Sequence, residues 1–406
     1  MTPADPQERR DRVFGPGMHL SYDRPVHAVS ARNVWITEAD GTKLLDAYNN
    51  VPHVGHGRPE VVRAIAAQAA LLNTNTRYLV DGVAEYAERL ISLLPEPLDT
   101  MFFANSGSEA NDLAWRIART VTGHDGAIVT ANAYHGATDL TMATSPEGLA
   151  ETGAALPAWV ATIAIPGELD QPSISSALHR LGQSGHEPAF LAIDTVLSSD
   201  GIFDPSPALS PLADQIRAAG GLFIADEVQA GFGRIGETLW GFAESAVVPD
   251  IVTFGKPMGN GHPLAAVVTR RDVAERFSER GYYFSTFAGN PVSAAAGMAV
   301  LDVMAAEALP RRAEKVGGYL RAAIRHIDHP AVGEVRGRGQ FTGVEIRGEE
   351  AVAAAHRIVN AMREHGVLIG ATGPQQNVLK IRPPLVFTEE HADILTAALR
   401  KVLTDL

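Results

Sequence analysis

The chain has 406 residues, more than one hydrophobic core usually organises, which favours two lobes. Hydrophobic residues make up 46% and charged residues 20%, an ordinary globular composition, and no apolar run reaches the ~18 residues of a membrane span. The net charge of −13, without a Lys/Arg-rich stretch, argues against nucleic-acid binding, and zero cysteines exclude disulfides, thiolate metal sites and cysteine nucleophiles.

The start of the chain, "MTPADPQERRDRVFGPG", is polar and charged and lacks the apolar core of a secretion signal. We therefore expect a cytoplasmic protein that does not enter a membrane. The stretch "AVSARNVWITEADGTKLLDA" contains hairpin-like pieces in which Asp40 and Gly41 are turn residues. Residues 1–50 are predicted to be the N-terminal part of a small domain.

Strand-like runs alternate with helical patterns between residues 51 and 290, which we predict to be the large domain. Most runs are continuously apolar, as in a mostly parallel sheet of seven strands covered by helices on both faces. The short gap before the last run favours an antiparallel edge strand there. The runs are "MFFAN" (101–105), "AIVTAN" (127–132), "VATIAI" (160–165), "AFLAIDTV" (189–196), "GLFIADEV" (221–228), "IVTFGK" (251–256) and "LAAVVTR" (264–270). The stretches "SEANDLAWRIARTV" and "SPLADQIRAAG" between them carry helical spacing.

The character of the sequence changes after Asn290, where "PVSAAAGMAVLDVMAAEAL" indicates a long helix opened by Pro291. Helices near 311–327, 349–366 and 388–404 surround short strands in "VRGRGQFTGVEI" and "NVLKIRPPL". Residues 291–406 are predicted to be the C-terminal small α+β domain.

Polar residues stand where three of the predicted strands end, the edge at which open α/β sheets bind ligands. In "FFANSGSEANDLAW" (102–115), Ser106, Gly107 and Ser108 lead into a helix. Its N-terminus offers free N–H groups and a positive dipole end for an anion such as phosphate. The alternative is an ordinary helix cap, with Ser108 as the N-cap and Glu109 in the first turn.

The other two strand ends carry an acid and a lysine. "FIADEVQAGFGR" (223–234) runs directly into Asp226 and Glu227, and "VTFGKPMGNGHP" presents Lys256, one of only five lysines. A carboxylate at a buried strand end needs a cation, either in an internal salt bridge or on a cofactor's ring nitrogen. A desolvated lysine is nucleophilic, although Lys256 could instead pair with Asp226.

A phosphate cradle, an acid for a pyridinium nitrogen and an aldehyde-binding lysine together predict pyridoxal 5′-phosphate as the cofactor. Tyr134, in "ANAYHGATD", follows another strand. It is either an aromatic platform for the ring or a core tyrosine.

The motifs "NSGSEAN", "AYHG", "ADEVQAGFGR", "FGKPMGNGHP" and "TFAGNPVSAAAG" resemble, in order, those of class III aminotransferases of pyridoxal-phosphate fold type I. The resemblance covers essentially the whole chain and implies that Lys256 binds the cofactor covalently while Asp226 contacts the pyridine nitrogen. It also implies that Gly107 and Ser108 hold the phosphate, to which the Ser106 hydroxyl can add a donor.

The same resemblance implies further cofactor contacts. Tyr134 would stack on the ring, Val228 would pack against it, Gln229 would lie near its phenolic oxygen, and His135 would lie close by. Thr286, in "STFAGNP", matches a threonine that reaches the phosphate bound in the neighbouring subunit, which implies a homodimer with shared active sites.

Lys256 is then the expected base for the α-proton, and the outcome is either transamination or β-elimination. "LDAYNNVPHVGHGRP", "LLNTNTRYL" and "NVLKIRPPLVFTEE" resemble ethanolamine-phosphate phospho-lyases, which convert O-phosphoethanolamine to acetaldehyde, ammonia and phosphate. Candidates for the substrate phosphate are Asn50, His53, Arg77 and Arg382.

Several alternatives stay open at this point. In the family, an arginine near the position of Arg382 typically binds a substrate carboxylate. His53 and His56 could equally be buried structural histidines. Because no third ligand is evident beside them, no metal site is expected. Asp194 stands where many relatives carry Glu, and the segment after "ATIAIPGELDQPS" is short, so other phosphorylated amines are further candidate substrates. The competing functions are an ω-transaminase and a non-catalytic regulator. The absence of a basic N-terminal extension disfavours the regulator.

Overall fold

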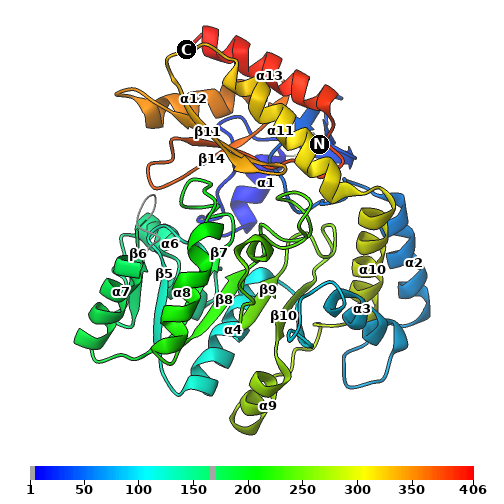
Figure 1. Ribbon diagram of the computed structural model, residues 1–406. Coiled ribbons are helices and arrows are strands. Elements are labelled where there is room, and N and C mark those ends of the chain that lie inside the picture. The colour runs from blue at the N-terminus through cyan, green and yellow to red at the C-terminus, as the bar shows by residue number, and fades with distance from the viewer. Residues whose placement is uncertain (1–4, 165–170) are drawn as a thin grey trace.

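The computed structural model describes residues 5–164 and 171–406. A seven-stranded sheet forms the centre of the larger lobe in Figure 1, and both chain ends lie in the smaller lobe above it. In spatial order the strands are β4 (Thr100–Ala104), β10 (Ala265–Thr269), β9 (Ile251–Phe254), β8 (Leu222–Asp226), β7 (Pro188–Asp194), β5 (Gly126–Thr130) and β6 (Val160–Ile163). β10 is antiparallel to both neighbours, and the remaining pairs are parallel. The predicted mostly parallel α/β sheet is confirmed.

One expectation about this sheet is wrong. β10 is antiparallel, as predicted, but it lies between β4 and β9 and not at the edge. All five of its residues are buried, so the interior suits it, whereas the half-buried β4 forms the edge. The last residue of the run "VATIAI", and residues 166–170 of the stretch "ATIAIPGELDQPS", lie outside the described residues.

The strands are apolar throughout because both faces of the sheet are covered. In β5, Ile128 packs into the core that includes Ile174 on α7 (Gln171–Gln183) and Leu212 on α8 (Ser206–Ala218), while the next residue, Val129, packs with Leu113 on α4 (Gly107–Thr122). The helices of this lobe are α2 (Pro59–Leu71), α3 (Asp81–Ile91), α4 (Gly107–Thr122), α5 (Asp139–Ala143), α6 (Pro146–Thr152), α7 (Gln171–Gln183), α8 (Ser206–Ala218), the 3₁₀ helix η1 (Gly241–Ser245) and α9 (Arg271–Arg280).

The cap of α4 differs from the expected one. Ser106 is the N-cap, and its side chain accepts a hydrogen bond of 3.2 Å from the Glu109 N–H. The interpretation of Ser108 as the cap is therefore wrong, although Glu109 lies in the first turn as expected. The hydroxyl of Ser108, on the first turn, accepts a hydrogen bond of 3.1 Å from the Ala137 N–H, and its own proton is free to be donated.

The smaller lobe contains two four-stranded sheets. One has the order β1 (Ala28–Arg32), β2 (Trp35–Glu38), β3 (Lys43–Asp46), β13 (Val367–Leu368), and the other β11 (Val332–Arg338), β12 (Phe341–Ile346), β15 (Val378–Ile381), β14 (Gly370–Thr372). The predicted turn is present between β2 and β3, where Gly41 has a φ of +88°. β13 pairs in parallel with β3, so the N-terminal hairpins are completed by residues near the other chain end.

Helices α11 (Leu309–Arg325), α12 (Ala351–Glu364) and α13 (Glu389–Thr404) match the predicted C-terminal helices, and α1 (Pro6–Val13) lies at the start of the chain. α10 (Pro291–Ala306) begins at Pro291 as expected, with the Asn290 side chain accepting from the Ser293 N–H at 2.9 Å. α10 packs on α2 and α3. The domain boundaries 1–50, 51–290 and 291–406 stay predictions.

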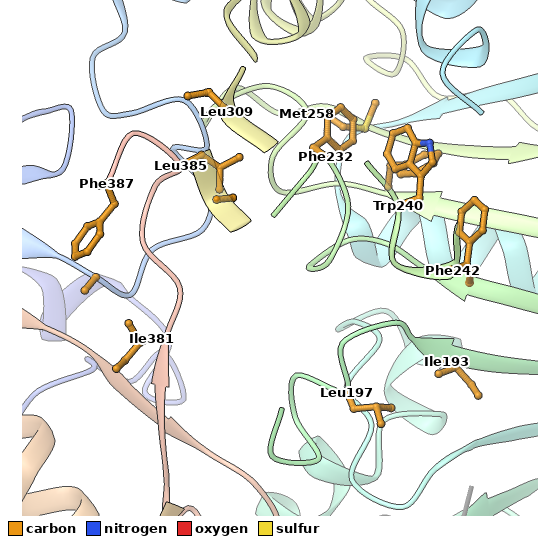
Figure 2. Close-up of a cluster of buried hydrophobic side chains, with 14 of the residues drawn as sticks. Ile193, Leu197, Phe232, Trp240, Phe242, Met258, Leu309, Ile381, Leu385 and Phe387 are labelled. Carbon is orange, nitrogen blue, oxygen red and sulfur yellow. The ribbon is translucent and has the colours of Figure 1, made fainter. Parts of the chain in front are cut away.

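The two lobes share one hydrophobic core. Figure 2 shows Phe232, Trp240 and Met258, from loops at the edge of the large sheet, and Ile381 and Leu385 from the small lobe, all in the same buried cluster. This continuous packing fixes the C-terminal strands over the edge of the large sheet. Within the described residues no single helix is long and apolar enough to cross a membrane; the bent pair α10 and α11 passes that test by length and composition.

Candidate active site

A pocket of about 280 Å³ lies at the edge where the parallel strands β4, β5, β7, β8 and β9 all end. Because parallel strands carry their carboxyl ends to one edge, residues from distant parts of the chain meet there. The lining residues are Gly107, Ser108, Asn111, Tyr134, His135, Gly136, Asp194, Asp226, Val228, Gln229 and Lys256.

Asp226 is the buried acid of this pocket, with 4% of its surface exposed. Its Oδ2 lies 2.7 Å from Nδ1 of His135 and accepts from Nδ2 of Asn111 at 2.9 Å, and its Oδ1 accepts from the Val228 N–H at 3.0 Å. Burial alone would raise the pKa of Asp226, but the His135 and amide contacts outweigh it and hold the pKa below its usual range. Asp226 is therefore a carboxylate that stays ionised.

Two buried polar atoms next to this acid have no protein partner in the described part of the chain: Nε2 of His135 and Oδ1 of Asn111. Buried polar atoms are normally satisfied, so their open positions favour a polar ligand in the pocket.

Lys256 follows β9 and projects into the same pocket. Among the described residues its Nζ has no hydrogen bond, and no carboxylate lies within ion-pair distance, so the alternative pairing with Asp226 is not formed. Burial, and then the charge of Arg382, lower the pKa of Lys256 to about 8. A substantial fraction of this amine is neutral near pH 8, as attack on an aldehyde requires.

The start of α4 forms one wall of the pocket, and glycines keep this wall free of large side chains. A Cβ at Gly107 would lie 2.8 Å from Cγ1 of Val228, and one at Gly136 would lie 2.7 Å from Oγ of Ser108. Only glycine fits at these two positions, so backbone N–H groups at the helix start stay accessible to an anion. Ser106 lies outside the pocket lining and is used as the cap.

Together these residues fit pyridoxal 5′-phosphate: a lysine for its aldehyde, an ionised acid for its ring nitrogen and a helix start for its phosphate. Tyr134 is 39% exposed and lines the pocket, which favours the aromatic platform over a core tyrosine. The individual contacts of these residues with the cofactor stay predictions.

Gln229 links the pocket to two of the predicted substrate residues. Its Oε1 accepts from Nδ2 of Asn50 at 3.3 Å and from the Arg382 guanidinium, and its Nε2 donates to Oγ of Ser198 at 2.7 Å. Asn50 and Arg382 are both buried, and Arg382 also lies 4.7 Å above the ring of Tyr48. The structure thus brings Asn50 and Arg382 to one side of the pocket.

His53 is placed differently from the expectation that it faces a phosphate. It is fully buried; its Nε2 donates to the Phe232 carbonyl at 2.8 Å, and its Nδ1 accepts from Arg234 at 3.2 Å. Burial, and then Arg234, hold its pKa well below the ordinary value. These contacts favour the structural alternative for His53. His56 likewise contacts Asp46, at 2.7 Å.

Arg77 and Thr286 lie together, outside the pocket lining. The guanidinium of Arg77 stacks 3.9 Å above the ring of Phe284, and a Cβ on Gly289 would lie 2.7 Å from the side chain of Thr76. Arg77 and Thr286 are both exposed. The structure therefore does not bring Arg77 into the pocket of its own chain.

Three residues of the pocket lining, Asn111, Gly136 and Asp194, are not among the predicted site residues, although the sequence marks Asp194 as standing where many relatives carry Glu. Asn111 lies one helical turn after Gly107, a spacing that puts both on one face of α4, so the quoted motif "NSGSEAN" held the signal. Asp194 lines the pocket as well, and burial, then the charge of Asp226, raise its pKa. The described residues contain no group of three or more His, Asp or Glu side chains that could hold a metal.

Comparison with known proteins places this geometry in a family. A family model described as aminotransferase class-III matches residues 19–403. The chain is 38% identical to "Alanine--glyoxylate aminotransferase 2-like" of Drosophila melanogaster, over 97% of this chain and 86% of that protein. It is 35% identical to "Ethanolamine-phosphate phospho-lyase homolog 1" of Caenorhabditis elegans, over 98% and 92%. A solved structure of a phospholyase from Arthrobacter in complex with phosphoethanolamine is 44% identical, with a TM-score of 0.94, covering 99% of this chain and 100% of that one.

Proposed function

Because this chain belongs to the class III aminotransferase family and is a pyridoxal 5′-phosphate enzyme of fold type I, we propose that it is a phospho-lyase acting on O-phosphoethanolamine. The products would be acetaldehyde, ammonia and phosphate. The observation that carries the proposal is the likeness, over nearly the full length of both chains, to a phospholyase solved with phosphoethanolamine. A related phosphorylated amine is a further candidate substrate.

The charges around the pocket agree with a phosphorylated substrate. The chain as a whole is acidic, with a net charge of −13, yet Lys256 and Arg382 lie on or beside the pocket. Arg382 is bonded to the neutral Gln229 and to no carboxylate within the described residues, so its charge is not cancelled locally. A buried, unneutralised guanidinium is suited to bind a phosphate.

The mechanism assigns separate tasks to the residues of the pocket. Bound pyridoxal 5′-phosphate supplies an electron sink that acidifies the hydrogens on the substrate's amine-bearing carbon. Lys256 would bind its aldehyde, Asp226 would face its ring nitrogen, and Gly107 and Ser108 would hold its phosphate. Asp226 stays ionised because of its hydrogen bonds, so it favours a protonated ring nitrogen.

Lys256 also moves the proton. Once the substrate's amine has displaced Lys256, its freed Nζ, with a pKa of about 8, would be neutral often enough to accept a proton from the amine-bearing carbon. Loss of phosphate from the adjacent carbon, followed by addition of water, gives the three products.

An ω-transaminase is the second candidate, supported by the aminotransferase name of the Drosophila relative. The two functions differ in their need for a keto acid. We expect the purified, cofactor-loaded protein to release phosphate and acetaldehyde from O-phosphoethanolamine without pyruvate. Product formation that requires pyruvate, with accumulation of the amine form of the cofactor, would establish the transaminase instead.

We also propose a homodimer with shared active sites. Large apolar side chains stand exposed beside Arg77 and Thr286, among them Tyr78 (66%), Leu79 (102%) and Phe287 (72%). Exposed apolar groups gathered in this way are typical of a surface covered by a partner. Arg77 and Thr286 lie outside the pocket of their own chain. A second copy placed here would bring them to the pocket of that copy.

Mixed dimers test the sharing. Lys256→Ala removes the lysine from one copy, and Arg77→Ala removes the arginine from the other. If the sites are shared, a mixed dimer has one site with both residues intact, and an equimolar mixture should recover about a quarter of wild-type activity. If Arg77 acts in its own chain, or not at all, mixing should produce no such recovery.

A further inference from the structure

Lys380 is a buried lysine for which the proposed mechanism has no task. It lies on β15, where its register partners are Gly343 on β12 and Gly370 on β14, so no neighbouring side chain covers it within the sheet. Because side chains alternate along a strand, Lys380 shares a face with Val378. Val378 packs with Ile202, from the loop that follows β7, so this face is turned toward the large lobe.

This lysine lacks a partner. Only 7% of its surface is exposed, yet among the described residues its Nζ has no hydrogen bond and no ion pair, and it lies 6.0 Å from the ring of Phe341. A lysine this far removed from solvent is normally paired, and the nearby carboxylates that act on it, Glu147 and Asp194, form no ion pair with it. The missing partner is therefore expected to be an anion that enters the site.

Two of the charged groups that act on Lys380 line the pocket, although Lys380 itself is not part of the lining. The charged groups are Arg382, Glu147, Asp194 and Lys256, of which Asp194 and Lys256 line the pocket and Arg382 reaches it through Gln229. Burial, then Arg382, lower the pKa of Lys380 to about 7, close to the pH at which a general acid works best. Two cations, Lys380 and Arg382, thus lie in the small lobe near the pocket, on the side from which Arg382 contacts Gln229.

Resting on the proposed phosphate elimination, we infer that Lys380 binds the substrate phosphate beside Arg382 and donates its ammonium proton to the bridging oxygen as the C–O bond breaks. The electron pair freed at the amine-bearing carbon forms the carbon–carbon double bond, and the C–O pair stays on oxygen. Without a proton the leaving group would be the phosphate trianion, a strong base. With the proton from Lys380 it departs as monohydrogen phosphate, and the neutral lysine regains a proton from solvent.

The test uses the cofactor-loaded enzyme and the variants Lys380→Gln and Lys380→Arg, with Lys401→Gln, an exposed lysine, as the matched control. Two readouts are combined. Elimination is measured with O-phosphoethanolamine and with 2-chloroethylamine, whose chloride leaves without a proton. Binding of inorganic phosphate is measured by calorimetry, and the cofactor's visible absorbance and the thermal midpoint show that each variant is folded.

Lys380→Gln is expected to weaken phosphate binding at least about tenfold and to lower kcat with O-phosphoethanolamine by roughly 10²–10³-fold, but to change chloride elimination only about fivefold or less. Lys380→Arg should keep phosphate binding within about threefold and still show the low kcat, because a guanidinium holds its protons. The control should match the wild type in both readouts.

Two results would overturn the inference: unchanged phosphate binding in Lys380→Gln, or a wild-type kcat in Lys380→Arg. Failure of the proposed function looks different. A wild-type enzyme that releases no phosphate from O-phosphoethanolamine would refute the phospho-lyase, while the calorimetric comparison would still report whether Lys380 forms a phosphate site.

Discussion

Replacing His53 by leucine separates a substrate contact from a structural one. The leucine has a similar volume but removes the donor to the Phe232 carbonyl and the acceptor for Arg234, at 2.8 and 3.2 Å. Losing a neutral buried hydrogen bond costs about 1 kcal/mol, and leaving a buried charged donor unpaired costs about 1.5–3 kcal/mol. We therefore expect His53→Leu to lower the free energy of unfolding by about 2–4 kcal/mol.

The pH dependence gives this prediction a second measurable part. The pKa of His53 is depressed in the folded protein, so the folded state keeps the ring neutral while the unfolded state takes up a proton below its ordinary pKa of about 6.5. The contribution of the neutral ring to the free energy of unfolding is thus fully present above that pH. It is lost as the pH falls, by up to about 1.4 kcal/mol per pH unit. His53→Leu should lack this part of the acid destabilisation.

Urea unfolding at pH 7.5 and pH 5.5, followed by tryptophan fluorescence and circular dichroism, measures both quantities. His19→Leu, at an exposed histidine, is the matched control and should stay within about 0.5 kcal/mol of the wild type. A His53→Leu protein that is less than about 1 kcal/mol destabilised, but binds O-phosphoethanolamine at least tenfold more weakly, would refute the structural role and restore His53 as a phosphate contact.

Three further predictions concern the cofactor pocket. Lys256→Ala should abolish the visible absorbance of the bound cofactor and the activity. Lys315→Ala, at an exposed lysine paired with Glu389, should retain both. Turnover near the wild-type level in Lys256→Ala would refute the assignment of Lys256 as the cofactor-binding lysine. Gly107→Ala should weaken cofactor affinity about tenfold or more in a fluorescence titration, because its Cβ meets the side chain of Val228 at 2.8 Å, whereas Gly182→Ala, with open space around it, should not. The rate of cofactor loading by the cofactor-free protein should rise with pH to a plateau with a midpoint near pH 8, because the neutral form of Lys256 reacts; a midpoint near the ordinary lysine value would contradict the burial argument.

The features that the sequence predicts well are those carried by continuous patterns. Apolar runs mark the strands of the large sheet, and since parallel strands end at one edge, Asp226 and Lys256 had to meet there. The order of the strands within the sheet is harder to predict. The residues of β10 do not indicate that it pairs with β4, a strand more than 150 residues earlier in the chain. β13 and β14, of two and three residues, are too short to leave a pattern.

The side chains that sequence reasoning misplaced or missed depend on partners far away in the chain. The environment of His53 is set by Phe232 and Arg234, 179 and 181 residues later. Lys380 is the one polar residue of the short strand β15, and the packing of Val378 against Ile202 shows that the face shared by Lys380 and Val378 is turned toward the large lobe. The residues at the strand ends, together with the family resemblance, predicted the cofactor, whereas these contacts required the fold.

The parallel pairing of Val367 with Leu45 has a consequence for biosynthesis. The N-terminal hairpins leave the ribosome early, but their last strand is made about 320 residues later, which takes roughly 15 to 65 seconds at ordinary rates of translation. During that interval the outer edge of β3 has no neighbour, and unpaired strand edges promote aggregation. Nascent chains stalled before Val367 should therefore need chaperone protection at this edge, and full-length chains should lose that need once translation ends.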